Sequence, residues 1–345
     1  MTKDNVIKAL RMLEEKYHKK EGYNTIQILK QLKIESNRNN AKLLRGCLRS
    51  MISKNVYPEF LTAGEYDIVY CPKGKGSGCY RLSEYDVNYI SLKEILLSNE
   101  YQNLCSPYSI PLGKDKNGKL VIINLENIQN LLICGMSGTG KTSAIFTILI
   151  SLILQNKSEN FKIICIDSMG VEYFPFLNTQ YSLFNAEESS YQKTFQVIDS
   201  IIQETNNRLK LKTKFPKVVC VIDDFANIQS DFELKKSNKF NDFINNIPLM
   251  NSVGIYVIMS TTIPTKNFIT DKLKDIFSNR LAFAVLNSID SNMIINQAGA
   301  ENLHTSNPGD CLLKTKENIK HLRCSYIRSQ DMISILKHYN TSNFS

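Results

Sequence analysis

The sequence predicts an α/β protein in which helices flank a mostly parallel sheet. Apolar runs of strand length recur through the second part of the chain, at 131–134, 163–166, 218–222, 255–259, 281–285 and 311–313. The stretches between them at 144–154, 191–209 and 268–277 have helical character. The longer runs are apolar without alternation, which indicates strands covered on both faces, and such strands are typical of parallel sheets.

A phosphate-binding loop is predicted directly after the first of these strands. Residues 135–142 match G-x-x-x-x-G-K-[ST] and lie between the strand at 131–134 and the helix at 144–154, as a P-loop requires. The residues expected to surround the phosphates are Gly135, Met136, Ser137, Gly138, Thr139, Gly140, Lys141 and Thr142. The alternative is a glycine-rich turn that matches by chance, which would not need a strand and a helix in register.

The chemistry expected at this loop is the binding of ATP with Mg²⁺. Glycines allow successive backbone N–H groups to surround phosphate oxygens, and the positive end of the following helix dipole faces the same anion. Lys141 should contact the β- and γ-phosphates, and the Thr142 hydroxyl should ligate the metal.

Two adjacent carboxylates follow the apolar run at 218–222. A buried strand that delivers Asp223 and Asp224 at its carboxyl end is typical of a Walker B element. Asp223 would hold Mg²⁺ directly or through water, and Asp224 would polarise the attacking water. Two turn-forming aspartates are the alternative, and the P-loop upstream argues against it.

Residues 1–86 predict a small domain that resembles a winged helix-turn-helix. Helices are expected at 5–18, from about 24 to 32 and at 37–53, where Asn24 and Gln27 form a capping box. Two β-like runs at 66–71 and 79–82 follow, and a basic, glycine-rich tip joins them. The third helix would enter a DNA groove and the hairpin would contact the phosphate backbone.

The charge of this part supports an interaction with a polyanion. Residues 1–86 hold 16 Lys/Arg and 10 Asp/Glu, so a quarter of the chain carries +6 of the net charge of +9. The candidate DNA contacts are Arg38, Lys42, Arg45 and Arg49 on the third helix and Lys73 and Lys75 at the hairpin tip. The alternatives are a solvated basic face and a protein-docking module.

The bulk composition bounds the remaining organisation. At 345 residues the chain is long enough for one α/β domain and a smaller unit, with a connector at 87–110 and the nucleotide-binding domain at 111–345. The sequence predicts neither a membrane segment nor an export signal. Any attachment to a membrane would therefore go through a membrane-bound partner protein. Nine cysteines occur without a C-x-x-C pair, which favours a reducing cytoplasm.

Several ordered motifs resemble the motor domain of the FtsK/SpoIIIE family of DNA translocases. An L-G-K-D-x-x-G hairpin before the P-loop is similar to Leu112–Asp115 with Gly118, and V-I-D-E-F-A is close to residues 221–226. The further matching segments are 130–142, 166–167 with 170–172, 254–264, 269–283, 289–291, 297–301 and 309–310. The resemblance covers about residues 90 to 335.

The resemblance implies a RecA-like ATPase core that assembles as a ring, usually a hexamer, around double-stranded DNA. Nucleotide would lie between subunits, with an arginine supplied in trans to the γ-phosphate. Arg280 matches the arginine of the T-R-I-A-F segment and is the candidate for this finger. Local pairing of Arg280 within its own subunit is the alternative.

Three departures from the family pattern bear on hydrolysis. Asp224 replaces a glutamate, so the carboxylate is about one ångström shorter in reach. The glutamine and arginine of A-T-Q-R-P are Thr262 and Ile263, which leaves Thr261 or Thr262 as a weaker γ-phosphate sensor. Asn292 replaces an arginine. These changes predict slow hydrolysis, or hydrolysis that depends on a different trigger.

The leading hypothesis is an ATP-driven translocase of double-stranded DNA or a DNA-transfer motor. A DNA-binding module in front and no membrane segment would suit a plasmid, a conjugative element or a phage. One alternative is a DNA-bound ATP switch or assembly factor that hydrolyses weakly, which the departures at Asp224 and Thr262 favour. The other is a coupling ATPase that acts on a protein substrate.

Overall fold

The chain divides into two units. The computed structural model describes residues 3–17, 23–52, 68–73, 77–82, 89–167, 173–177, 179–183, 191–211, 213–234, 236–305 and 307–339. One unit is Met1–Tyr89 with Arg328–Ile333, and the other is Ile90–Ile327 with Ser334–Ser345. The functional division at 1–86, 87–110 and 111–345 stays a prediction.

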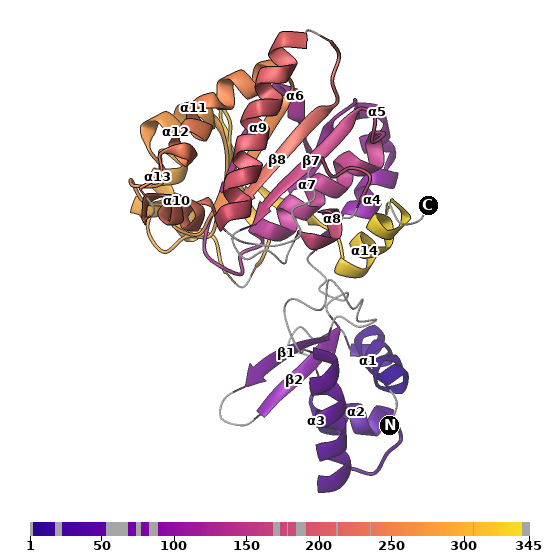
Figure 1. Ribbon diagram of the computed structural model, residues 1–345. Helices are drawn as coiled ribbons and strands as arrows, with labels where there is room; N and C mark the ends of the chain where they lie inside the picture. Colours follow the sequence, from indigo (N-terminus) through magenta and orange to yellow (C-terminus); the bar gives the residue numbers. More distant parts are fainter. Residues whose placement is uncertain are drawn as a thin grey trace. The chain divides into compact units, whose positions relative to one another are not determined.

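A ten-stranded sheet forms the centre of the larger unit (Figure 1). Along the sheet the strands follow the order β5-β4-β12-β11-β10-β6-β9-β8-β7, and β3 pairs with β12 beside this path. The strands are β3 (Ile90–Ser91), β4 (Ser109–Asp115), β5 (Leu120–Asn124), β6 (Leu131–Cys134), β7 (Phe161–Asp167), β8 (Lys217–Asp223), β9 (Ile255–Thr261), β10 (Asn279–Phe283), β11 (Asp310–Lys314) and β12 (Ile319–Tyr326).

The two halves of this sheet differ in strand direction, and the short strand β3 also pairs with β12 in parallel. Strands β10, β6, β9, β8 and β7 pair in parallel, which confirms the predicted core. Strands β10, β11, β12, β4 and β5 pair antiparallel. The loops β4–β5 and β11–β12 are too short for the crossover that parallel neighbours need, so each pair forms a hairpin.

Helices cover this sheet on both faces. The helices of the larger unit are α4 (Leu92–Leu97), α5 (Asn99–Leu104), α6 (Leu125–Ile128), α7 (Lys141–Gln155), α8 (Phe174–Leu177), α9 (Tyr191–Leu211), α10 (Phe225–Leu234), α11 (Lys239–Ser252), α12 (Asp271–Ile276), α13 (Ser288–Ile295) and the 3₁₀ turn η2 (Ala300–Asn302). Figure 1 shows α10 to α13 grouped beside α9.

The two sheet faces meet different helices. Leu132 and Cys134 belong to a core cluster with residues of α9 to α13. Helix α7 packs against β4 and β12 instead. Because alternate strand residues point to opposite faces, this division places α7 on the other side of the sheet. The last helix, α14, runs over Ser329–His338, and no described helix is long and apolar enough to cross a bilayer.

The smaller unit contains three helices and a hairpin. Helices α1 (Lys3–Tyr17), α2 (Thr25–Gln31) and α3 (Arg38–Ile52) precede the antiparallel pair β1 (Ile68–Lys73) and β2 (Ser77–Leu82). The predicted capping box is confirmed: the Gln27 N–H donates to the Asn24 side chain at 2.9 Å, and the Asn24 N–H donates back to Gln27 Oε1 at 3.0 Å. The winged-helix assignment stays a prediction.

Candidate functional site

The predicted P-loop leaves the carboxyl end of the central strand β6. This strand lies between β9 and β10, and all of its residues are buried. The Gly135 N–H donates to the Thr261 carbonyl of β9 at 3.3 Å, and the Met136 N–H donates to the Ala284 carbonyl after β10 at 2.9 Å. Both neighbouring strands therefore fix where the loop begins.

Close backbone contacts explain two glycines of the loop. Gly135 has φ +151°, and a Cβ atom there would lie 2.6 Å from Phe283 Cβ. Gly140 has φ +106°, and a Cβ atom there would lie 2.9 Å from the Gly309 nitrogen. Gly309 also donates its N–H to the Thr139 carbonyl at 2.9 Å. A side chain at either loop position would push the loop off β10 or off the start of β11.

The cationic group of the loop lies at its centre. Lys141 is 8% exposed, and its Nζ donates to the Met136 carbonyl at 2.9 Å. The Thr139 hydroxyl donates to the same carbonyl at 2.7 Å. Helix α7 begins at Lys141, and its N-cap Gly140 supplies no side-chain cap. Ammonium, helix dipole and first-turn N–H groups are therefore gathered where a phosphate would lie.

Asp223 at the end of β8 completes a metal-binding geometry. The Thr142 hydroxyl lies 3.4 Å from Asp223 Oδ2 and donates to it. Asp223 is 8% exposed. A threonine hydroxyl beside a carboxylate is a set of hard oxygen donors, and Mg²⁺ prefers such donors together with phosphate oxygens and water. The predicted pair therefore fits the metal, which would neutralise phosphate charge when bound.

Asp224 has a left-handed backbone and a partly buried carboxylate. Its φ is +51°, a conformation that is uncommon outside glycine, asparagine and aspartate. Asn227 donates to Asp224 Oδ2 at 2.5 Å. Burial, followed by the nearby Asp223 charge, raises the pKa of Asp224, and the backbone and hydroxyl of Thr262 oppose this rise. The predicted base and the predicted sensor Thr262 therefore face each other.

Arg280 lies inside the subunit. It is 4% exposed in β10, where it pairs with Leu132 of β6, and its Nη1 donates to the Lys274 carbonyl at 3.3 Å. Its Nε is buried and has no partner among the described residues. Burial lowers the pKa of the guanidinium. The role of Arg280 as a finger in trans stays a prediction, and it would require this side chain to leave its pocket.

The burial of Arg280 gives an expected result for its replacement. Arg280→Met should lower the melting temperature, because it removes the hydrogen bond to Lys274 and leaves that carbonyl without this donor. We expect a loss of about 2–4 °C, measured by calorimetry without nucleotide. If Arg280 also acts as a finger in trans, the same variant should lower hydrolysis about 10³-fold or more, and hydrolysis that stays near the wild-type rate would contradict that role.

The sequence comparisons decide the family. A family model described as FtsK/SpoIIIE family matches residues 91–300, more than half of the chain. The chain belongs to the FtsK/SpoIIIE family. It is 29% identical over 271 residues to the DNA translocase FtsK of Clostridium tetani, with coverage of 72% of this chain and 36% of that protein. The FtsK of Listeria monocytogenes is 28% identical, with 70% and 34% covered. The chain thus spans about a third of the length of these relatives.

Two solved structures share this fold. The cytoplasmic domain of the type VII secretion ATPase EccC from Thermomonospora curvata matches with a TM-score of 0.61 at 15% identity, covering 73% of this chain and 34% of that one. The pCW3 conjugation coupling protein TcpA, in a monomer form with ATPγS, matches with a TM-score of 0.58 at 16% identity. That match covers 85% of this chain and 86% of TcpA.

The predicted DNA contacts are only partly described. Arg38, Lys42 and Arg45 are exposed on α3, on a different side from the buried Leu44 and Leu48. Arg45 Nε donates to the Ala41 carbonyl of its own helix at 3.1 Å. The predicted contact Lys75 lies outside the described residues, and so do the side chains of Arg49 and Lys73.

Several groups at the site were not predicted from the sequence. Ser260 of β9 and Tyr173 before α8 both donate to Asp223, and Asn227 donates to Asp224. Tyr173 is 50 residues from Asp223, and no spacing rule connects them. The position of Ser260 just before Thr261, in the strand beside β8, was the available signal.

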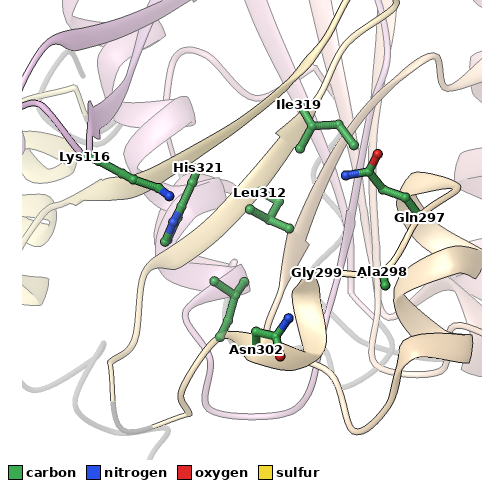
Figure 2. Close-up of a pocket in the computed structure, with 9 residues that line it drawn as sticks. Lys116, Gln297, Ala298, Gly299, Asn302, Leu312, Ile319 and His321 are labelled. Carbon is green, nitrogen blue, oxygen red and sulfur yellow. The ribbon is translucent and has the colours of Figure 1, made fainter.

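A hollow of about 450 Å³ lies beside the antiparallel half of the sheet, and no predicted site residue lines it. Figure 2 shows Leu312 and Ile319 among its lining residues, with Lys116 reaching toward His321 and Gln297 on the other side. His321 Nε2 lies 3.2 Å from Asp310 Oδ1. The His321 ring therefore already has a hydrogen-bond partner beside this hollow.

Proposed function

We propose that this chain is an ATP-driven translocase of double-stranded DNA. The observation that carries the proposal is the assembly of Lys141, Thr142, Asp223 and Asp224 in a member of the FtsK/SpoIIIE family. These residues follow the parallel strands β6 and β8, which lie on either side of β9. ATP is the proposed nucleotide, Mg²⁺ the proposed metal and the cytoplasm the proposed location. A membrane-bound partner is compatible with this proposal, as is an origin in a plasmid, a conjugative element or a phage.

Each site residue would have a distinct role in ATP hydrolysis. Lys141 would leave the Met136 carbonyl for a phosphate oxygen, which is the better acceptor because it is charged. Thr142 and Asp223 would hold Mg²⁺, which supplies charge neutralisation at the phosphates. Asp224 would accept a proton from water, with Thr262 beside it to report the γ-phosphate.

The proposal assigns two further tasks outside this site. The basic residues of the smaller unit would bind the DNA backbone, since they concentrate charge in a quarter of the sequence. A ring of copies, most simply a hexamer, would surround the duplex and supply an arginine in trans. Arg280 is the proposed finger in that assembly.

Triplex displacement tests the proposal. Purified protein, ATP and a duplex that carries a third strand should release that strand at a rate that depends on ATP. A protein that binds DNA but neither displaces the third strand nor shows DNA-stimulated hydrolysis would not be a translocase. Strong hydrolysis that requires a protein partner rather than DNA would favour a coupling ATPase.

Charge removal on α3 should weaken DNA binding. The double variant Lys42→Ala/Arg45→Ala removes two exposed cations, so the slope of log affinity against log salt should fall by about 2. Fluorescence anisotropy with labelled duplex at several salt concentrations measures this slope. Lys30→Ala/Lys33→Ala is a matched control, because it also removes two exposed cations but lies outside α3. An equal change in both variants would indicate only a general charge effect.

A DNA-bound ATP switch is the second candidate, and the geometry around Asp224 favours it. The shorter carboxylate is hydrogen-bonded to Asn227, and Thr262 offers a hydroxyl where the family pattern has an amide. Both features reduce the reach of the hydrolytic groups. A switch would bind nucleotide and assemble on DNA but turn over ATP slowly.

A further inference from the structure

The Tyr173 hydroxyl contacts the oxygen of Asp223 that faces the P-loop. Tyr173 is 2% exposed, and its ring packs against Phe146 of α7 with centroids 5.3 Å apart. Its hydroxyl donates to Asp223 Oδ2 at 3.0 Å. Thr142 donates to the same oxygen from 3.4 Å. A buried tyrosine thus shares the carboxylate oxygen on which the proposed metal site depends.

Donors from the protein contact both carboxylate oxygens of Asp223. Its Oδ1 accepts from the Ser260 hydroxyl and from the Asp224 N–H at 3.1 Å. Its Oδ2 accepts from Thr142 and Tyr173. An ionised carboxylate has about four lone-pair sites, so these donors fill them.

The two oxygens of Asp223 have different roles. Ser260 on β9 and the backbone of Asp224 lie at the ends of packed strands, and their donors on Oδ1 already fix the orientation of the carboxylate. Tyr173 therefore adds little to that orientation. Its main effect is to occupy Oδ2, the oxygen next to Thr142.

We propose that the Tyr173 hydroxyl competes with Mg²⁺, or with its bound water, for Asp223 Oδ2. This inference rests on the proposed Mg²⁺–nucleotide site. Thr142 can keep its hydrogen bond to Asp223 while its oxygen binds the metal, but Tyr173 offers only its proton to this oxygen. Metal binding must then displace Tyr173, which sets a higher Mg²⁺ requirement than the other ligands alone would impose.

Removal of one oxygen atom tests this competition. Tyr173→Phe keeps the ring and its packing, and it should lower the Mg²⁺ concentration for half-maximal strengthening of nucleotide binding by about tenfold. The readout is the affinity of a fluorescent ATP analogue during a Mg²⁺ titration that starts in EDTA. The affinity in EDTA should not change. A higher or unchanged Mg²⁺ requirement would overturn the proposal.

Two further variants separate competition from general disturbance. Ser260→Ala removes an orienting donor from Oδ1 and should raise the Mg²⁺ requirement, the opposite direction. Tyr181→Phe is the matched control, because Tyr181 is also buried and donates to the Asn156 carbonyl at 2.7 Å. It should leave the Mg²⁺ requirement unchanged, and a tenfold fall in this variant would also overturn the proposal.

The wild-type titration separates a failure of the proposed metal site from a failure of the proposed competition by Tyr173. If the wild-type chain binds the nucleotide equally well in EDTA and in Mg²⁺, the proposed metal site fails, and the role of Tyr173 fails with it. If wild-type binding depends on Mg²⁺ and Tyr173→Phe does not alter that dependence, only the competition fails.

Discussion

Lys141→Ala should lower the rate of ATP hydrolysis by about 10²–10³-fold. Lys141 is the buried cation at the centre of the P-loop, and it is held 2.9 Å from a carbonyl that a phosphate oxygen would replace. Alanine removes the charge that would stabilise the γ-phosphate in the transition state. Steady-state phosphate release measures the loss, and strand displacement in the triplex assay should disappear with it.

Lys162→Ala is the matched control for this variant. Lys162 is a half-buried lysine on β7, and its Nζ also donates to a backbone carbonyl, that of Gln180, at 2.7 Å. It lies outside the P-loop, so its replacement should leave hydrolysis within about twofold. Equal losses in the two variants would mean that Lys141 acts through the fold and not on the nucleotide.

Asp224→Asn should slow hydrolysis and stabilise the protein at the same time. The amide cannot accept a proton from water, so kcat should fall by about 10²–10⁴-fold while nucleotide affinity persists. The melting temperature should rise by about 2–4 °C. Asparagine adopts the left-handed backbone at φ +51° as aspartate does, and it removes a partly buried charge that also lies next to Asp223. Calorimetry at neutral pH and phosphate release measure the two effects.

The pH dependence of this stabilisation follows from the raised pKa of Asp224. The folded state holds the proton more tightly than the unfolded state does. The contribution of Asp224 to stability is therefore full below the pKa of an unfolded aspartate and is lost as pH rises through the folded pKa. The advantage of asparagine should appear above that window and vanish at acidic pH. Asp231→Asn, at an exposed aspartate of α10, should show no such trend.

The sequence predicted those parts of the site whose elements follow one another directly along the chain. The strand β6, the glycine turn and α7 are consecutive, and so are β8 and Asp223, so spacing and residue type predicted both halves of the site. The two halves meet because β6 and β8 both pair with β9 in parallel. Their carboxyl ends therefore lie at one edge of the sheet.

The sequence did not predict the features that depend on contacts between elements far apart in the chain. Ser260 and Tyr173 reach Asp223 from separate elements, and Arg280 is buried although its motif suggested an exposed finger. Helices α10 and α11 were not predicted, although the buried residues Phe240, Phe243, Ile247 and Met250 of α11 recur at helical spacing; Pro248 lies within this helix. The hairpins β4–β5 and β11–β12 follow from short loops and not from strand composition.

The contact of Gly309 with the P-loop has a mechanical consequence. Its N–H donates to the Thr139 carbonyl at 2.9 Å, and its own carbonyl accepts the N–H of Cys324 in β12 at 2.8 Å. One residue thus connects the loop backbone to β12, which lies between β11 and β4 inside the sheet. Any displacement of the loop at Thr139 must lengthen these hydrogen bonds or move β12 with the loop. A phosphate that shifted the P-loop would therefore also shift the antiparallel half of the sheet.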